Sequence, residues 1–222
     1  MKKLPQLGKP LDNDQVKFLE IFSKSCRKSI LEMVTIAQSG HPGGSLSSID
    51  YLATLYAFII GQTGEKIVVS NGHISPAVYS VLAEMGYVSK PEAVKNFRKF
   101  GSKFEGHVTR HVEGVWYGTG PLGIGVSVAA SFALAEKLNK TGKRVFALMG
   151  DGEVEEGQVH EFIQFSKHHK LDNLILFVDY NQVQLTASLK ETQDINIQKI
   201  FEAGSFRIIN IDAHNFSDIW AA

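Results

Sequence analysis

Two stretches of sequence decide the fold: Arg144-Val-Phe-Ala-Leu-Met-Gly-Asp-Gly152 and Leu174-Ile-Leu-Phe-Val-Asp-Tyr-Asn181. Each begins with a continuous apolar run, which is typical of a strand buried on both faces. Residues 155–168 between them are expected to form a helix, so the two strands should lie parallel in one sheet. The sequence therefore predicts an α/β fold, with a parallel sheet flanked by helices on both faces.

Further helices and strands are expected on either side of this unit. Strands are predicted at 66–70 and 206–211, and helices at 14–39, 75–85, 91–100, 126–137 and 197–203. Gly40-His-Pro-Gly-Gly44 should end the first helix, and Ser47 or Ser48 with Asp50 should cap another that runs to Phe58. Residues 101–125 predict a long irregular loop, which compact domains usually keep for function. No repeat or linker divides the chain, so one domain over 1–222 with an N-terminal arm is expected.

Composition excludes several classes of protein. Lys+Arg and Asp+Glu both number 23 in the 222 residues, so the composition shows no excess of positive charge of the kind that binds nucleic acid. A single cysteine, Cys26, rules out an internal disulfide framework and fits a reducing compartment. The most apolar stretch, Tyr51–Ile60, is about half the length that spans a bilayer. With no recognisable targeting signal at the N-terminus, we predict a cytoplasmic protein with no membrane partner.

Polar residues follow each of the four predicted strands. They are Gly72-His73, Gly150-Asp151, Asn181 and His214. In parallel α/β sheets, ligands bind beyond the carboxyl ends of the strands. The sequence therefore predicts that these groups converge on one rim of the sheet and form a site.

Asp151 and Asn181 are the strongest chemical signal on this rim. A carboxylate and an amide oxygen suit Mg²⁺ or another hard divalent cation such as Ca²⁺, whose remaining ligands would be phosphate oxygens and water. Gly150 and Gly152 allow close backbone approach to an anion, and the following helix start offers amide donors. Together they predict a metal-bridged diphosphate, although Gly-Asp-Gly alone is also a common strand-to-helix turn.

The surrounding motifs resemble one known family. Gly150-Asp-Gly152 with Asp179-Tyr-Asn181 resembles the thiamine diphosphate signature. The chain as a whole resembles the N-terminal half of transketolase, and the motifs that carry the resemblance occur in the right order: Ser39-Gly-His-Pro-Gly-Gly-Ser-Leu-Ser47, Ser70-Asn-Gly-His73, Gly118-Thr-Gly-Pro-Leu-Gly-Ile-Gly125, Gly150-Asp-Gly-Glu-Val-Glu-Glu-Gly157 and Asp212-Ala-His-Asn215. The resemblance implies the thiamine-diphosphate-binding fold, in its pyrophosphate-type domain.

The resemblance also implies roles for individual residues. Asp151, Asn181 and the backbone carbonyl of Val183 match the family's ligands for the divalent cation. Glu156 matches a glutamate at the subunit interface that helps couple two cofactors, and we group it with the cofactor-binding residues. The other positions that match cofactor-binding residues are His73, Gly120, Leu122, Gly150 and Gly152. His41, His107 and His214 match histidines that contact sugar oxygens or cofactor and move protons, and are the predicted catalytic residues.

The assignment of histidines to proton transfer does not depend on the family resemblance alone. The ordinary pKa of histidine allows it to give and take protons near neutral pH. His160, His168 and His169, on or near a helix end, are expected to be surface or satisfied core residues without a functional role, whereas for His111 both interpretations stay open. His107 and His111 are the only pair with a spacing that a zinc site could use. Gly118-x-Gly120-x-x-Gly123 fits a dinucleotide fingerprint, but it lacks a preceding strand and the following acid.

Three positions depart from the family pattern. Gln182 follows Asn181 where the family often has glycine, and Asp-Ala-His replaces the usual Asp-Gly-His. Trp116 replaces an acid before the 118–125 loop, which bears on the polar contacts of the loop and on sugar specificity. The metal ligands are unchanged, so cofactor binding is expected to survive.

The resemblance implies that part of the enzyme lies on another chain. The glutamate that activates the cofactor belongs to a pyrimidine-binding domain, which these 222 residues do not contain. We therefore expect the N-terminal subunit of a split transketolase, in a heterotetramer with a C-terminal subunit. It would transfer a two-carbon ketol unit from a ketose phosphate to an aldose. The alternatives are a transketolase-like chain that acts on a nonstandard sugar and a non-catalytic cofactor-binding protein.

Overall fold

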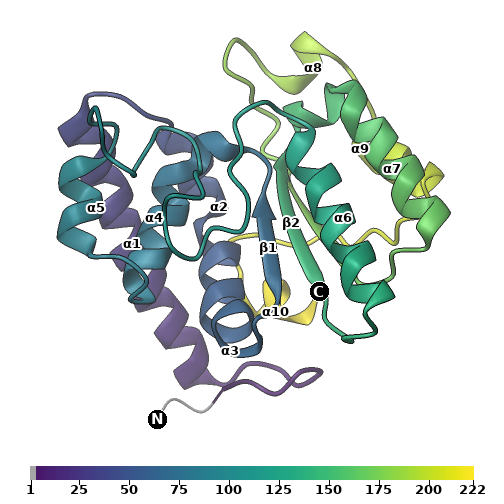
Figure 1. The fold of residues 1–222 in the computed structure, drawn as a ribbon, viewed down its shortest axis with the longest axis horizontal. Helices are drawn as coiled ribbons and strands as arrows, with labels where there is room; N and C mark the ends of the chain where they lie inside the picture. Colours follow the sequence, from purple (N-terminus) through teal and green to yellow (C-terminus); the bar gives the residue numbers. More distant parts are fainter. Residues whose placement is uncertain (1–3) are drawn as a thin grey trace. The chain divides into compact units, whose positions relative to one another are not determined.

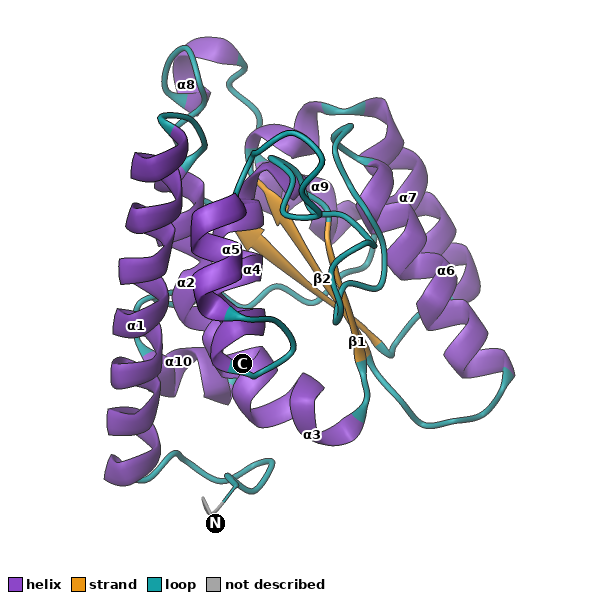
Figure 2. Ribbon diagram, turned by 60° about the vertical axis from the view of Figure 1, so that its left-hand side comes forward, coloured by secondary structure: helices purple, strands orange, loops and turns teal. Residues whose placement is uncertain are grey.

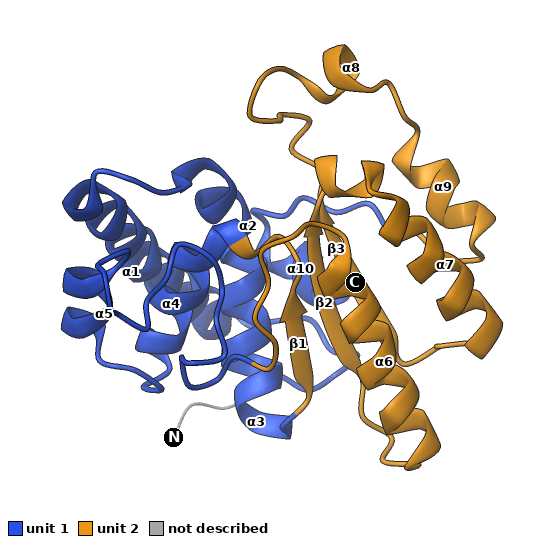
Figure 3. Cartoon of the chain, turned by 45° about the horizontal axis from the view of Figure 1, so that its top comes forward, with its two compact units in different colours: residues 1–64, 73–115, 209–222 blue, residues 65–72, 116–208 orange. Residues whose placement is uncertain are grey.

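The computed structural model describes residues 4–222, which fall into two units along the chain (Figure 3). The first unit comprises residues up to Gly64 together with His73–Val115 and Ile209–Ala222, and the second comprises Glu65–Gly72 and Trp116–Ile208. The parallel sheet lies wholly in the second unit, and the first unit is helical.

The second unit is built on three parallel strands (Figures 1 and 2). The strands are β1 (Lys66–Val69), β2 (Val145–Gly150) and β3 (Leu174–Asp179), in the order β1-β2-β3. Val69 pairs with Leu148, and Gly150 pairs with Asp179, so the carboxyl ends of β2 and β3 are level. This register puts the residues that follow both strands at the same edge of the sheet.

Helices of the same unit pack on this sheet. They are α6 (Ile124–Leu138) and α7 (Gly157–His169), which lie side by side in Figure 2, and α9 (Ile197–Ala203). The short helix α8 (Leu189–Thr192) lies away from the strands in Figure 1. Ala129, Ala130 and Ala133 of α6 are fully buried in one apolar cluster with the strands. These small side chains let α6 pack closely against the strands. At the start of α6, Gly125 lies against the residue that follows β1, and a Cβ on it would be only 2.6 Å from the Cα of Ser70. The α/β fold with a parallel sheet flanked by helices is therefore confirmed.

The first unit is a set of packed helices. The longest, α1 (Asn13–Ala37), begins with a capping box between Asp12 and Gln15 and ends at Gln38 in the left-handed conformation. Leu19, Cys26, Ile30 and Met33 form its fully buried face. The others are α2 (Pro42–Leu55), the π-helix η1 (Tyr56–Ile60), α3 (Gly61–Thr63), the 3₁₀-helix η2 (Gly72–Ile74), which begins at the unit boundary, α4 (Ser75–Glu84), α5 (Lys90–Asn96) and α10 (Phe216–Ala221).

The start of α2 differs from the sequence prediction. This helix begins at Pro42, and Ser48 and Asp50 lie inside it instead of at its cap. Proline is pre-organised for the first helical position, because its missing N–H would have no partner there. The pair Gly43-Gly44 therefore continues the helix, although glycine pairs more often interrupt one.

The strand predicted at 206–211 does not form. Residues 206–211 have no regular secondary structure, although Phe206 and Ile208 still pack against the apolar cluster of the second unit. An alternating apolar pattern is sufficient for packing, but a strand also needs a backbone partner. The helix predicted from 155 is also preceded by a 3₁₀ turn, η3 (Gly152–Glu155). None of the helices within residues 4–222 has the length and apolar character needed to cross a bilayer.

Candidate functional site

Asp151 lies directly against the segment that follows β3. Its Oδ2 accepts a hydrogen bond from the backbone N–H of Gln182 at 2.6 Å, and its Oδ1 accepts one from the N–H of Gly152 at 2.8 Å. Its own N–H donates to the carbonyl of Asp179 at 3.1 Å. The structure thus brings Asp151 together with residues 181–183, which carry the other two predicted metal ligands.

The environment of Asp151 favours a bound cation. The residue is only 3% exposed, and this burial raises the pKa of its carboxyl above the ordinary value. Hydrogen bonds from Gln182 and Gly152 oppose that shift, while the nearby Asp179 carboxylate adds to it. A buried negative charge beside a second acid is unfavourable unless a cation compensates it.

The available donors fit a hard divalent cation completed by another ligand. Asp151 offers a carboxylate, Asn181 an amide oxygen and Val183 a backbone carbonyl, all of them oxygen ligands. Asn181 Oδ1 accepts the N–H of Val183 at 2.9 Å and keeps a second lone pair. Among residues 4–222, no group of three or more His, Cys, Asp or Glu side chains is placed to hold a metal. Mg²⁺ takes six oxygen ligands, so phosphate oxygens and water would complete the three that this chain offers.

Gln182, next to Asn181, adopts an unusual backbone conformation. Its φ is +61°, in the left-handed region that favours glycine. This conformation aims its N–H at Asp151 and explains why glycine is common at this position in the family that the sequence resembles.

Replacing Gln182 by glycine is therefore expected to leave the loop in place and to relieve strain. We expect the free energy of unfolding to rise by at most about 1 kcal/mol, because relief of left-handed strain exceeds the extra chain entropy of glycine. Denaturant unfolding of both proteins would measure it. Gln184→Gly removes a side chain whose Nε2 donates to Glu155 Oε1 at 2.5 Å, so this second change should lower the free energy of unfolding instead. A clear loss of stability in Gln182→Gly would show that the conformation is not strained.

Glu153 is a site residue that the sequence analysis missed. It is 2% exposed, and its carboxylate accepts hydrogen bonds from three different segments. The donors are the hydroxyl of Ser70 after β1, the N–H of Gly123 before α6 at 2.7 Å, and the N–H of Gly150 at the end of β2 at 3.4 Å. Burial raises the pKa of Glu153, and these hydrogen bonds oppose that shift.

The predicted cofactor-contacting loop 118–125 lies against the end of β1. Thr119 Oγ1 donates to the carbonyl of Val69 at 2.6 Å, and a Cβ on Gly72 would lie 2.8 Å from the carbonyl oxygen of Thr119. Gly120 is half-buried and Leu122 is exposed. Glu156 is also exposed, and its side chain lies beside Gly123. Through Gly123, this loop thus contacts both Glu153 of η3 and Glu156, which directly follows η3.

Three of the four predicted site histidines lie together in the first unit. The rings of His41 and His73 are 5.2 Å apart, centroid to centroid. Burial and then the charges of Arg98 and His107 lower the pKa of His41, whereas burial, His41 and His107 lower the pKa of His73 to about 4. His73 is therefore neutral at pH 7. His214, in contrast, bonds through Nδ1 to Asp50 at 2.8 Å.

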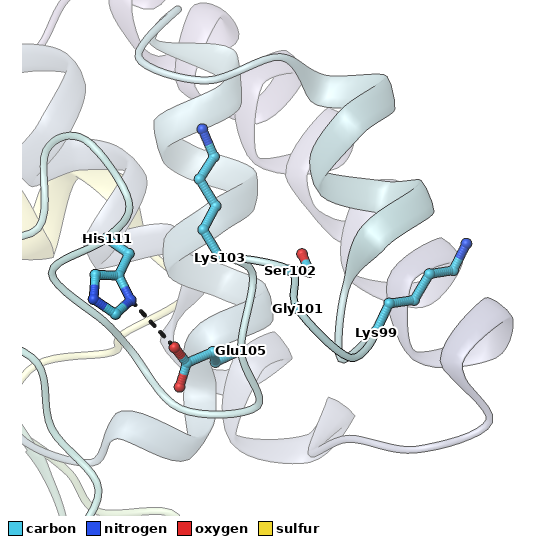
Figure 4. Close-up of a pocket in the computed structure, with 6 residues that line it drawn as sticks. All are labelled: Lys99, Gly101, Ser102, Lys103, Glu105 and His111. Atoms are coloured by element: carbon cyan, nitrogen blue, oxygen red, sulfur yellow. Dashed lines mark ion pairs between the residues drawn. The ribbon is translucent and has the colours of Figure 1, made fainter.

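The remaining histidines have no comparable setting. His111 is exposed and pairs with Glu105 at 3.4 Å, beside a shallow pocket of about 410 Å³ (Figure 4). The side chains of Lys99 and Lys103 at this pocket point away from each other, so its charges do not converge. His160 and His168 are exposed on α7, and the half-buried His169 packs at a tilt against Phe165.

Trp116 lies near the amino end of β1, not beside Asp151. Lys66 Nζ is 5.2 Å from the centroid of its ring, and the same lysine pairs with Glu136. Lys66 opens β1, whereas the predicted ligands follow the carboxyl ends of β2 and β3. Trp116, which stands where the family often has an acid, thus makes a cation–π contact with Lys66.

Comparison with known proteins identifies the family. A family model described as "Transketolase, thiamine diphosphate binding domain" matches residues 21–222. The chain belongs to the transketolase family. Its structure is similar to transketolase from Campylobacter jejuni, with a TM-score of 0.86 and 32% identity over 92% of this chain and 34% of that one. This confirms both the predicted resemblance to the N-terminal half of transketolase and the thiamine-diphosphate-binding fold.

The relatives differ in how much of their length the chain covers. It is 33% identical to one of the subunits of apulose-4-phosphate transketolase of Phocaeicola vulgatus, over 92% of this chain and 76% of the relative. It is 32% identical to the SqwG subunit of 6-deoxy-6-sulfo-D-fructose transketolase of a Clostridium species, over 88% of this chain and 74% of the relative. Against human transketolase the identity is 32% over 95% of this chain, but only 35% of the human protein. The chain therefore spans about a third of that transketolase and about three quarters of the two subunits.

Proposed function

We propose that this chain is the N-terminal subunit of a two-component transketolase. It would transfer a two-carbon ketol unit from a ketose phosphate to an aldose acceptor, with thiamine diphosphate and Mg²⁺ or a similar divalent cation. The observation that supports this most directly is the hydrogen bond between the buried Asp151 carboxylate and the segment 181–183, in a chain of the transketolase family.

The second unit would bind the diphosphate end of the cofactor. Asp151, Asn181 and the carbonyl of Val183 would hold the cation, while backbone at Gly120, Leu122, Gly150 and Gly152 would lie against the cofactor. Glu156 would lie at the interface with the partner. When bound, thiamine diphosphate supplies an electron sink for the two-carbon carbanion. The chain's own contribution is to orient the cofactor and to hold the cation that would compensate its charge.

The first unit would handle the sugar and its protons. His41 and His107 would hydrogen-bond to sugar oxygens together with His214, and His73 would bind the cofactor. The lowered pKa values of His41 and His73 keep both rings neutral at pH 7, so that each has one nitrogen able to accept a proton. This suits a reaction in which hydroxyl groups lose and regain protons.

The partner would supply the pyrimidine-binding domain and its activating glutamate. Two relatives that match over most of their length are named as transketolase subunits, which supports this arrangement. We propose a cytoplasmic heterotetramer of two chains of each kind.

The test is to assay the purified chain alone and after assembly with the partner. The substrates would be the common ketose phosphates, apulose 4-phosphate and 6-deoxy-6-sulfofructose, because the relatives' names include unusual sugars. We expect ketol transfer only with both chains, cofactor and cation, and loss of transfer when a chelator removes the cation. Full activity of the chain alone would contradict the split arrangement. Cofactor binding without transfer from any donor would favour the non-catalytic alternative.

A further inference from the structure

A buried carboxylate in the first unit joins three segments that are far apart in the sequence. Asp50, in α2, is 4% exposed. Arg27 of α1 approaches it with two nitrogens, at 2.6 Å from Oδ1 and 2.7 Å from Oδ2. His214, before α10, places its ring Nδ1 2.8 Å from Oδ2. Asp50 is thus held on both oxygens by Arg27 while it also binds the imidazole ring.

The chemistry of these groups determines which histidine nitrogen carries the proton. Burial alone would raise the pKa of Asp50, but hydrogen bonds from Arg27 and His214 hold it below its ordinary value. The group is therefore a carboxylate and can only accept hydrogen bonds. His214 Nδ1 must then be the donor, and Nε2 is the ring nitrogen left for a ligand.

The backbone and the neighbouring residues support this placement. The N–H of His214 donates to Asp212 Oδ1 at 2.9 Å, which forms a turn at the start of the segment. Farther along, Trp220 Nε1 donates to the carbonyl of Lys9 at 2.9 Å, and the Trp220 ring packs edge-on against Phe58. The histidine side chain itself is 56% exposed, so it remains accessible.

We propose that Asp50 is a positioning residue, which fixes His214 in the Nδ1–H tautomer so that Nε2 can exchange a proton with the substrate. In the proton-accepting step, the Nε2 lone pair takes the proton of a sugar hydroxyl and the ring becomes an imidazolium. Asp50 stabilises that charge and takes no proton. In the reverse step, Nε2 returns the proton to oxygen. The catalytic part of this inference rests on the proposed function, whereas the tautomer does not.

The tautomer can be tested in the whole chain by NMR, with ¹⁵N-labelled histidine and no partner or substrate. We expect one downfield Nδ1–H resonance that exchanges slowly with water. It should disappear in both Asp50→Asn and His214→Asn. The second variant keeps the Asp50–Arg27 pair, so it guards against a folding defect in the first. If this proton lay on Nε2 in the unaltered chain, or if Asp50→Asn left the resonance unchanged, the inference would be wrong.

The positioning role can be tested in the assembled two-chain enzyme. We expect Asp50→Asn to lower kcat about 10- to 100-fold, less than the roughly 10²- to 10⁴-fold contribution of an acid–base residue, which His214→Asn should lose. The double variant should be no slower than His214→Asn, because the two residues act as a unit. Asp218→Asn, an exposed aspartate on α10, is the matched control and should leave kcat unchanged.

Additive effects of Asp50→Asn and His214→Asn would overturn the positioning role. An inactive assembly of unaltered chains would instead refute the proposed function, while the NMR result would stand by itself. The two failures are therefore distinguishable.

Discussion

Replacing Asp151 by asparagine is expected to weaken cofactor binding by more than about 100-fold, beyond the 10- to 100-fold typical of residues outside the ligand shell. The substitution keeps the size of the side chain but removes the negative charge that the cation needs. It also turns one hydrogen-bond acceptor into a donor that would face the N–H of Gln182 or Gly152. Calorimetric titration of thiamine diphosphate with Mg²⁺ into the assembled enzyme would measure the change.

Asp172→Asn is the control for this substitution. Its carboxylate is 84% exposed and pairs with Lys137 on the surface. Exposed ion pairs contribute little, so neither binding nor stability should change measurably. If Asp151→Asn bound the cofactor as tightly as this control, the proposed cation site would be wrong.

Removing the Glu153 carboxylate is expected to give the largest loss of stability. In Glu153→Ala, the Ser70 hydroxyl and the N–H groups of Gly123 and Gly150 lose their acceptor. Each unsatisfied buried donor costs about 1–3 kcal/mol, and partial rehydration would recover some of it, so we expect a loss of about 2–4 kcal/mol. Denaturant unfolding would measure it. Glu153→Gln retains one acceptor oxygen and should lose less.

Amide exchange can separate this role from general loosening of the fold. The N–H groups of Gly123 and Gly150 should exchange faster in Glu153→Ala than in the unaltered chain, while those in the middle of β2 change less. Glu161→Ala, an exposed glutamate on α7, should stay within about 0.5 kcal/mol of the unaltered chain. Unchanged protection of Gly123 in Glu153→Ala would mean that the carboxylate does not hold the loop.

Local signals were sufficient where the sequence prediction agreed with the structure. The apolar runs at β2 and β3 predict strands, and α9 matches its predicted range of 197–203. These elements depend on residue types a few positions apart, which the sequence displays directly. The start of α2 at Pro42 was also a local matter, but two local preferences conflicted there: proline favours a helix start, whereas the glycine pair favours a break.

Part of the candidate site was also visible in the sequence. Asp151 and Asn181 each follow an apolar run, and parallel strands that are adjacent in sequence commonly pair. The approach of Asp151 to the segment after β3 could therefore be predicted, and the structure shows it at Gln182. Glu153 could not be found in this way, because its partners Ser70 and Gly123 are 83 and 30 positions away. In the sequence, an acid at position 153 is equally consistent with a negative charge that stabilises the start of a helix.

The amino-acid sequence alone determined the α/β class, the transketolase resemblance and the approach of Asp151 to the segment that follows β3, because these follow from short-range periodicity and from motifs. Only the tertiary structure decided that 206–211 forms no strand, that Glu153 joins three segments, and that His214 binds Asp50, 164 positions away. Backbone pairing and side-chain hydrogen bonds of this kind depend on the distances and directions that folding creates, and no local pattern encodes them.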